Sequence, residues 1–116
     1  MITSRLEDGI VWFTIDGELK ANELIPETDK WLSRSNEYCG YISDVRKMTT
    51  ASAMDKKRIE EQRKSNKTGK PNAILLKDGA MAVIAKIYIN FTKAENTQYF
   101  TNPEKAIEWL KRNKGT

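Results

Sequence analysis

The chain has 116 residues, of which 39% are hydrophobic and 31% are charged, and its formal net charge is +4. This length fits a single domain, 1–116, and the balance of apolar and charged residues is that of a globular protein rather than a disordered one. No apolar run approaches the roughly 20 residues of a membrane span, and the first residues lack the apolar core of a secretory signal, so we expect a cytoplasmic protein.

The first elements of the chain are predicted to be two antiparallel strands. Asp8-Gly9 is a strong hairpin signal between the alternating residues 2–7 and the β-branched and aromatic run 10–15. A second aspartate–glycine pair, at 16–17, is expected to end the second strand.

A helix is predicted next, within residues 18–34, where the apolar positions have rough helical spacing. Pro26 interrupts this spacing, so either the helix kinks there or its regular part begins with Pro26 in the first turn. Residues 38–45 then predict a third strand, in which Cys39 is expected to be a buried core thiol.

A second helix is predicted from Ser52 to about Lys67. Ser52 and Asp55 have the spacing of an N-terminal cap with an acid three residues on. Residues 55–70 hold seven basic side chains against three acidic ones, and such a helix can attract an anionic partner. It carries no aromatic side chain for base stacking, so nucleic acid ranks lowest among the partners considered.

The rest of the chain predicts strands at 72–76 and 97–100 and a final helix. In that helix Asn102 is the capping residue and Pro103 occupies the first helical position. Residues 80–93 fit both a helical face and the alternation of a strand, so periodicity alone leaves them open.

No catalytic or metal-binding pattern appears in the sequence. The chain has no histidine and one cysteine, which removes the histidine-activated nucleophiles and the commonest zinc ligand. We therefore expect no enzymatic activity, no metal and no cofactor.

The segment from Phe100 to Leu110 has the pattern F-x-x-x-E-x-A-x-x-W-L. This pattern resembles the ending of SpoIIAA-like proteins, which are relatives of the STAS domain of anti-sigma-factor antagonists and share a superfamily grouping with the CRAL-TRIO lipid carriers. The resemblance implies an α/β (α+β) fold, with a mixed β-sheet of about five strands and about four helices packed on it. It also makes residues 80–92 a helix.

In STAS antagonists a partner kinase phosphorylates a serine at the start of the second helix, and this modification switches binding to that kinase. By the resemblance, the corresponding hydroxyls here are Thr50 and Ser52. The aspartate and the glycine of the antagonist pattern Asp-Ser-Ser-Gly are both missing. The two hydroxyls are therefore candidates either for a phosphate at a helix N-terminus or for plain helix caps.

A candidate polar ligand site lies in the third strand. Ligands of α/β sheets bind beyond the carboxyl ends of the strands. Asp44 is expected at such an end, near Arg46 and Thr49, so these three residues form the candidate site. The alternative is that Asp44 only caps the turn that follows it.

The predicted helix at 80–92 is apolar over more than half of its circumference. Such a helix needs cover on two sides, from the sheet and from a second copy of the chain, a protein partner or a lipid-like ligand, unless it is buried entirely in its own core. The candidate apolar interaction surface consists of Met81, Ile84, Ile87, Tyr88 and Phe91.

These features favour a non-enzymatic regulatory or protein-interaction module of STAS type, which we expect to be a homodimer. The alternative is a domain that binds a lipid or another hydrophobic small molecule. The sequence does not name the partner, the ligand or the pathway.

Overall fold

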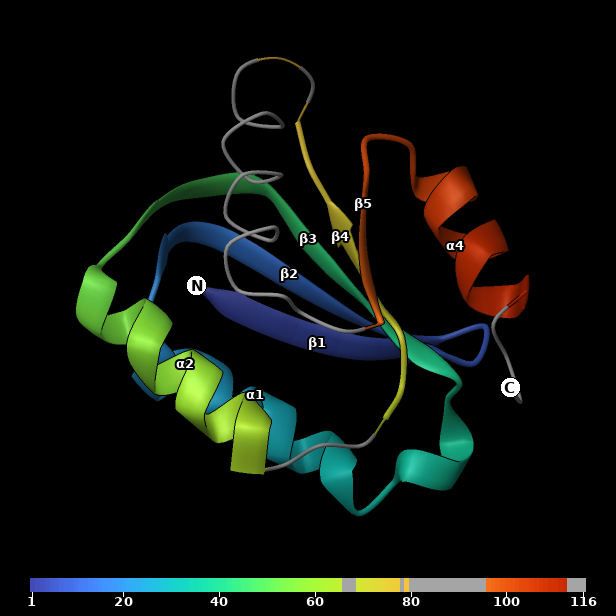
Figure 1. The fold of residues 1–116 in the computed structure, drawn as a ribbon, viewed down its shortest axis with the longest axis horizontal. Coiled ribbons are helices and arrows are strands. Elements are labelled where there is room, and N and C mark those ends of the chain that lie inside the picture. Colours follow the sequence, from blue (N-terminus) through green and yellow to red (C-terminus); the bar gives the residue numbers. More distant parts are fainter. Residues whose placement is uncertain (66–68, 78, 80–95, 113–116) are drawn as a thin grey trace.

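The computed structural model describes residues 1–65, 69–77, 79 and 96–112. Within them, five strands form one sheet in the order β1-β2-β3-β4-β5 (Figure 1). β1 is antiparallel to β2, and the other neighbouring strands are parallel. The strands are β1 (Ile2–Glu7), β2 (Ile10–Leu19), β3 (Gly40–Ala51), β4 (Asn72–Leu75) and β5 (Thr97–Phe100).

Three α-helices lie within the described residues. They are α1 (Ala21–Leu32), α2 (Ala53–Ser65) and α4 (Pro103–Arg112), and a short 3-10 turn, η1 (Ser35–Glu37), follows α1. The predicted fold class, a mixed sheet of about five strands with helices packed on it, is confirmed. The fourth expected helix, at residues 80–92, lies outside the described residues.

The alternation of β2 gives the sheet two apolar faces. Ile10 points to the face that α4 covers, whereas Val11 and Phe13 point to the opposite face, where Trp31 of α1 packs on them. α1 and α2 lie together, well apart from α4 (Figure 1). The core on the α4 face consists of Ile10, Ile42, Ala73, Leu75, Ala106 and Leu110, all fully buried.

The predicted hairpin between β1 and β2 is confirmed. Asp8 and Gly9 have φ values of 55° and 72°, as a tight two-residue connection between antiparallel strands requires. The register places Arg5 opposite Trp12, and the Arg5 guanidinium lies 5.1 Å from the centre of the Trp12 ring.

The predicted ends of β2 and β3 are wrong. β2 passes through Gly17 to Leu19, with irregularities in its register on either side of that glycine, and β3 continues beyond residue 45 to Ala51. β4 ends opposite Asp44, so among the described strands the last part of β3 pairs only with β2. The residues of this last part of β3, after Asp44, are largely exposed and mostly polar. They therefore lack the apolar alternation from which a strand is predicted.

Of the two predictions for Pro26, the one that places it in the first turn of the regular helix is wrong. Pro26 stands in the second turn of α1, and the structure assigns one helix to the whole of Ala21–Leu32. Proline at this position cannot donate a hydrogen bond to the carbonyl of Asn22, four residues earlier, and its side chain is exposed. Cys39, which we expected to be buried, is only partly buried beside the α4-face core.

The last helix begins as predicted. Oδ1 of Asn102 accepts hydrogen bonds from the amides of Glu104 (2.8 Å) and Lys105 (3.3 Å), which caps α4. At its other end, Nζ of Lys111 lies 2.7 Å from Oδ2 of Asp8 in the β1–β2 turn. Among the described residues, no helix is long and apolar enough to cross a membrane.

Candidate functional site

The N-termini of α1 and α2 meet at one end of the sheet. β2 and β3 run parallel to their last residues, where Glu18 pairs with Thr50 and Leu19 pairs with Ala51. Each strand leads directly into a helix, α1 at Ala21 and α2 at Ala53. The two helices therefore begin next to each other and are in contact (Figure 1).

Ser52 and Asp55 form a reciprocal pair at the start of α2. Oγ of Ser52 accepts a hydrogen bond from the Asp55 amide at 3.0 Å and donates one to Oδ2 of Asp55 at 2.6 Å. Oδ1 of Asp55 accepts a further hydrogen bond from the amide of Ala21 at 3.0 Å. One carboxylate thus satisfies donors from both helix N-termini.

The same contacts determine the charge of Asp55. The hydrogen bond from Ser52, followed by that from the Ala21 amide, lowers the pKa of Asp55 below its ordinary value, and the positive charges of Arg58 and Lys20 act in the same direction. Asp55 is therefore a carboxylate at neutral pH. It is held as a hydrogen-bond acceptor, so it is poorly suited to act as a general base.

Thr50 occupies a different setting from Ser52. It lies in β3, paired with Glu18, and not at a helix N-terminus as the resemblance implied. Its side chain is exposed. The longer β3 is the reason, because the strand ends at Ala51 and leaves Ser52 as the residue directly before α2.

Asp44, Arg46 and Thr49 all lie in β3, so they do not surround the end of a strand as expected. Arg46 binds Asp44 through its backbone amide and, with both Nε (3.0 Å) and Nη2 (2.9 Å), through its guanidinium. Burial raises the pKa of Asp44, but the hydrogen bonds from Arg46 and the charges of Arg46 and Lys47 outweigh this effect and hold it below the ordinary value. Asp44 is thus already paired by its own strand. Thr49 is exposed.

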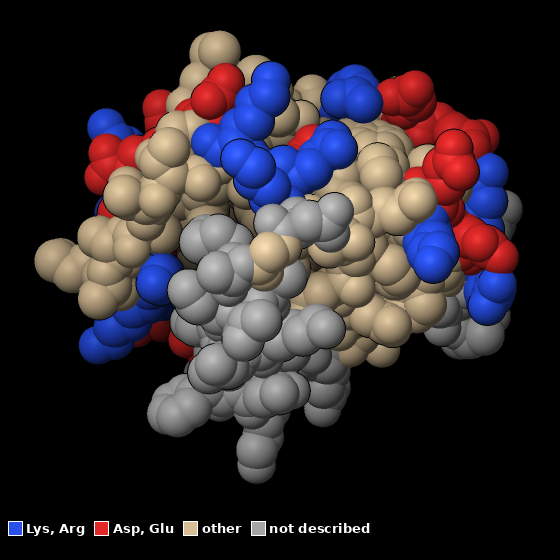
Figure 2. Space-filling model, turned by 90° about the horizontal axis from the view of Figure 1, so that it is seen from above, with Lys and Arg blue, Asp and Glu red and all other residues tan. Residues whose placement is uncertain are grey.

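The face seen in Figure 2 carries both signs of charge. A group of Lys and Arg side chains lies near the upper centre of this view, and further Lys and Arg side chains lie among the Asp and Glu side chains on both sides of it (Figure 2). This is a mixed surface rather than a continuous basic one of the kind that follows a phosphate backbone.

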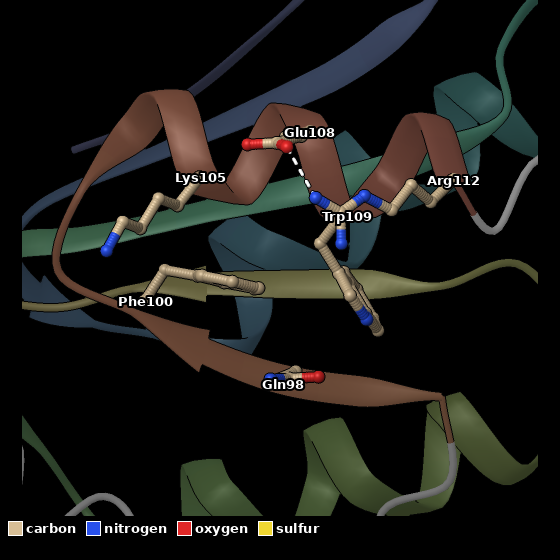
Figure 3. A pocket seen from close by; sticks show the side chains of 6 residues that line it. All are labelled: Gln98, Phe100, Lys105, Glu108, Trp109 and Arg112. Atoms are coloured by element: carbon tan, nitrogen blue, oxygen red, sulfur yellow. Dashed lines mark hydrogen bonds and ion pairs between the residues drawn. The ribbon is translucent and has the colours of Figure 1, made fainter.

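A pocket of about 290 Å³ lies between β5 and α4. Figure 3 shows that its wall on α4 is one stripe of the helix and that β5 supplies Phe100 and Gln98. The rings of Phe100 and Trp109 lie 5.6 Å apart, and Glu108 is paired with Arg112. Glu108 is the only carboxylate among the described residues that line the pocket, and because it is already bound to a guanidinium, these residues offer no pair of groups for acid–base chemistry.

The family model described as "Domain of unknown function (DUF7793)" matches residues 5–114. The chain belongs to the DUF7793 family. None of the curated proteins matches it.

Solved structures show how widely the fold of this DUF7793 chain is shared. An uncharacterised protein of the DUF3478 family with a SpoIIAA-like fold, from Shewanella loihica, is similar with a TM-score of 0.71 and 15% identity over 95% of this chain and 92% of its own. The unphosphorylated anti-sigma factor antagonist SpoIIAA gives a TM-score of 0.64 at 8% identity, covering 96% and 98% of the two chains. An anti-sigma factor antagonist from Mycobacterium paratuberculosis gives 0.64 at 9% identity, covering 96% and 93%. The resemblance stated from the sequence is confirmed for the fold.

The sequence did not indicate the second role of Asp55. The spacing of Ser52 and Asp55 predicts a cap for α2, but Ala21 lies 34 residues away, and only the tertiary structure brings its amide to the carboxylate. The apolar surface proposed at Met81, Ile84, Ile87, Tyr88 and Phe91 lies outside the described residues. Among those that are described, no group of three or more His, Cys, Asp and Glu residues could hold a metal ion.

Proposed function

We propose that this DUF7793 protein is a non-enzymatic regulatory module of STAS type that binds a protein partner, with Ser52 as the residue whose phosphorylation switches the binding. The observation that carries the proposal is the position of Ser52, an exposed hydroxyl directly before α2 in a SpoIIAA-like fold. Two of the similar structures are anti-sigma factor antagonists, and one of them is described in its unphosphorylated form. Ser52 is preferred to Thr50 because only Ser52 stands at the N-terminus of a helix.

The surroundings of Ser52 support a protein-binding surface. Met54, in the first turn of α2, is 77% exposed, which is unusual for a large apolar side chain and provides a flexible contact for a partner. The helix N-terminus also favours negative charge, so a phosphate can be accommodated there. Adding that phosphate changes the charge of the surface by about −1.5 to −2 at neutral pH.

The experiment is affinity capture from cells that express the protein natively, using tagged wild type, Ser52→Ala and Ser52→Glu. We expect wild type and Ser52→Ala to recover the same partner, and Ser52→Glu to recover about tenfold less, because the added charge opposes binding at a desolvated contact. Thr50→Glu is the matched control, since it adds the same charge two residues earlier, on β3. Equal recovery with all four proteins would contradict the proposal.

A hydrophobic small molecule remains the alternative ligand. That prediction, like the homodimer, rests on the apolar residues between 81 and 91, which lie outside the described residues. No observation on the described residues supports a hydrophobic ligand, so we prefer the proposal of a protein partner.

A further inference from the structure

Asp55 connects Ser52 to a second helix. Both of its oxygens are used, Oδ2 by the Ser52 hydroxyl at 2.6 Å and Oδ1 by the Ala21 amide at 3.0 Å. Ala21 is the first residue of α1 and is fully buried, and the residue before it, Lys20, makes no side-chain cap. The first amide of α1 therefore depends on a side chain that belongs to α2.

We infer that phosphorylation of Ser52 releases the Ala21 amide from Asp55, so that a modification at the start of α2 is transmitted to the start of α1. The identity of the modified residue rests on the proposed function. The coupling itself rests on the three hydrogen bonds around Asp55.

The chemistry of the modification explains the release. Phosphoryl transfer from a nucleoside triphosphate forms an O–P bond at Oγ of Ser52, breaks the bond between the γ-phosphorus and the departing nucleoside diphosphate, and releases the hydroxyl proton to the solvent. Oγ of the modified Ser52 has no proton left to donate to Asp55, and the phosphate on it carries a charge of about −1.5 to −2 next to the carboxylate. Like charges at contact distance repel each other, so the Asp55 carboxylate turns away from Ser52 and loses its position at Ala21.

The effect on α1 follows from the burial of Ala21. A buried amide without an acceptor is destabilising, so the first turn of α1 opens more often once Asp55 has moved. This turn carries the exposed side chains of Asn22 and Glu23. A partner that contacts the molecule here therefore meets a changed surface on both helices, not only a new charge on one.

The test is amide hydrogen exchange, followed by NMR, on the isolated protein with phosphoserine incorporated at position 52 during synthesis. We expect the exchange rate of the Ala21 amide to rise about tenfold or more relative to the unmodified protein. Asp55→Ala should give the same rise, because it removes the same acceptor. Phosphoserine at position 50 is the matched control, since it adds the same charge on β3 without contacting Asp55, and it should leave Ala21 unchanged.

An Ala21 amide whose exchange is unchanged or slower in the protein phosphorylated at 52 would overturn the inference, as would an equal effect of phosphoserine at 50. If Asp55→Ala does not fold, the comparison of positions 52 and 50 decides alone. The measurement needs no partner, so a failed coupling would leave the proposed function standing. Conversely, a protein without a phosphorylation-sensitive partner in cells would not affect this result.

Discussion

Asp55 is one side chain that accepts hydrogen bonds from the starts of two helices. Its carboxylate is an acceptor for Ser52 and for Ala21, and both hydrogen bonds lower its pKa. The pKa of Asp55 is lower in the folded protein than in the unfolded chain. Asp55 therefore contributes stability that is fully present at pH values above its pKa in the unfolded chain. That contribution is lost as the pH falls through the pKa that Asp55 has in the folded protein.

We therefore predict that Asp55→Asn destabilises the protein at pH 7 and that the difference from wild type shrinks as the pH falls from about 5 to about 3, around the ordinary aspartate pKa near 3.9. Urea unfolding of both proteins at several pH values measures this difference in the free energy of unfolding. In a Ser52→Ala background the pH-dependent part should be smaller, because the first cause of the lowered pKa is gone. If Asp55→Asn lowers the free energy of unfolding by the same amount at pH 7 and pH 3.5, the ionised Asp55 carboxylate does not have this stabilising role.

Gly40 matters for a different reason, the close packing of α4 on β3. A Cβ atom at this position would lie 2.8 Å from Cδ2 of Leu110 and 2.8 Å from the backbone oxygen of Pro71. The Leu110 side chain could shift, but the Pro71 oxygen accepts a hydrogen bond from the Tyr41 amide and is part of the backbone.

Gly40→Ala should therefore lower the free energy of unfolding by about 1–3 kcal/mol, the usual range for an overpacked core. Urea unfolding should show a lower midpoint with an unchanged slope. Thr49→Ala, at an exposed position of the same strand, serves as the control. A stability of Gly40→Ala within about 0.5 kcal/mol of wild type would mean that the Pro71 backbone does not lie this close to Gly40.

At the scale of elements, helix α4 depends most clearly on its local sequence. Asn102 caps two amides in the first turn, and Pro103 stands where its missing N–H costs nothing. Asn102→Ala should destabilise the protein by about 1 kcal/mol, measured by thermal or urea unfolding. Thr101→Ala, one residue earlier and also exposed, should have little effect. Equal effects of the two substitutions would show that the cap contributes nothing.

Elements specified by local patterns were predictable from the sequence, and those specified by their neighbours were not. The hairpin at Asp8-Gly9 and the start of α4 at Asn102 each follow from a few adjacent residues. The extension of β3 to Ala51 depends on pairing with β2 along an exposed arm, which leaves no apolar alternation to detect. α1 includes Pro26 in its second turn, whereas the local rule for proline places it in the first turn of a helix.

The candidate site, too, was predictable from the sequence only in part. The spacing of Ser52 and Asp55 indicates a helix cap, and the resemblance to STAS antagonists directs attention to hydroxyls in this region. Only the parallel pairing of β2 with β3 brings Ala21 to Asp55, and no pattern in the sequence encodes that contact. Asp44 was expected at a strand end, and it lies within a longer strand, bound to Arg46.

At the scale of the whole molecule, the fold directs two parallel strands into two helices that start side by side. This arrangement places Ser52, Asp55 and the exposed Met54 at the start of α2 and connects Asp55 to the first amide of α1. In this DUF7793 chain the proposed function resides at that junction of the helices. Neither the pocket beside α4 nor the paired carboxylate of Asp44 supplies a comparable site.

The most direct measurement is the phosphate content of Ser52 in protein isolated from its native cells. Size-exclusion chromatography separates the free protein from the partner-bound protein, and mass spectrometry then measures the modified fraction of Ser52 in each. We predict phosphate on Ser52 in the free fraction and almost none in the bound fraction. A Ser52 that carries no phosphate in either fraction, or the same amount in both, would contradict the regulatory role proposed for this site.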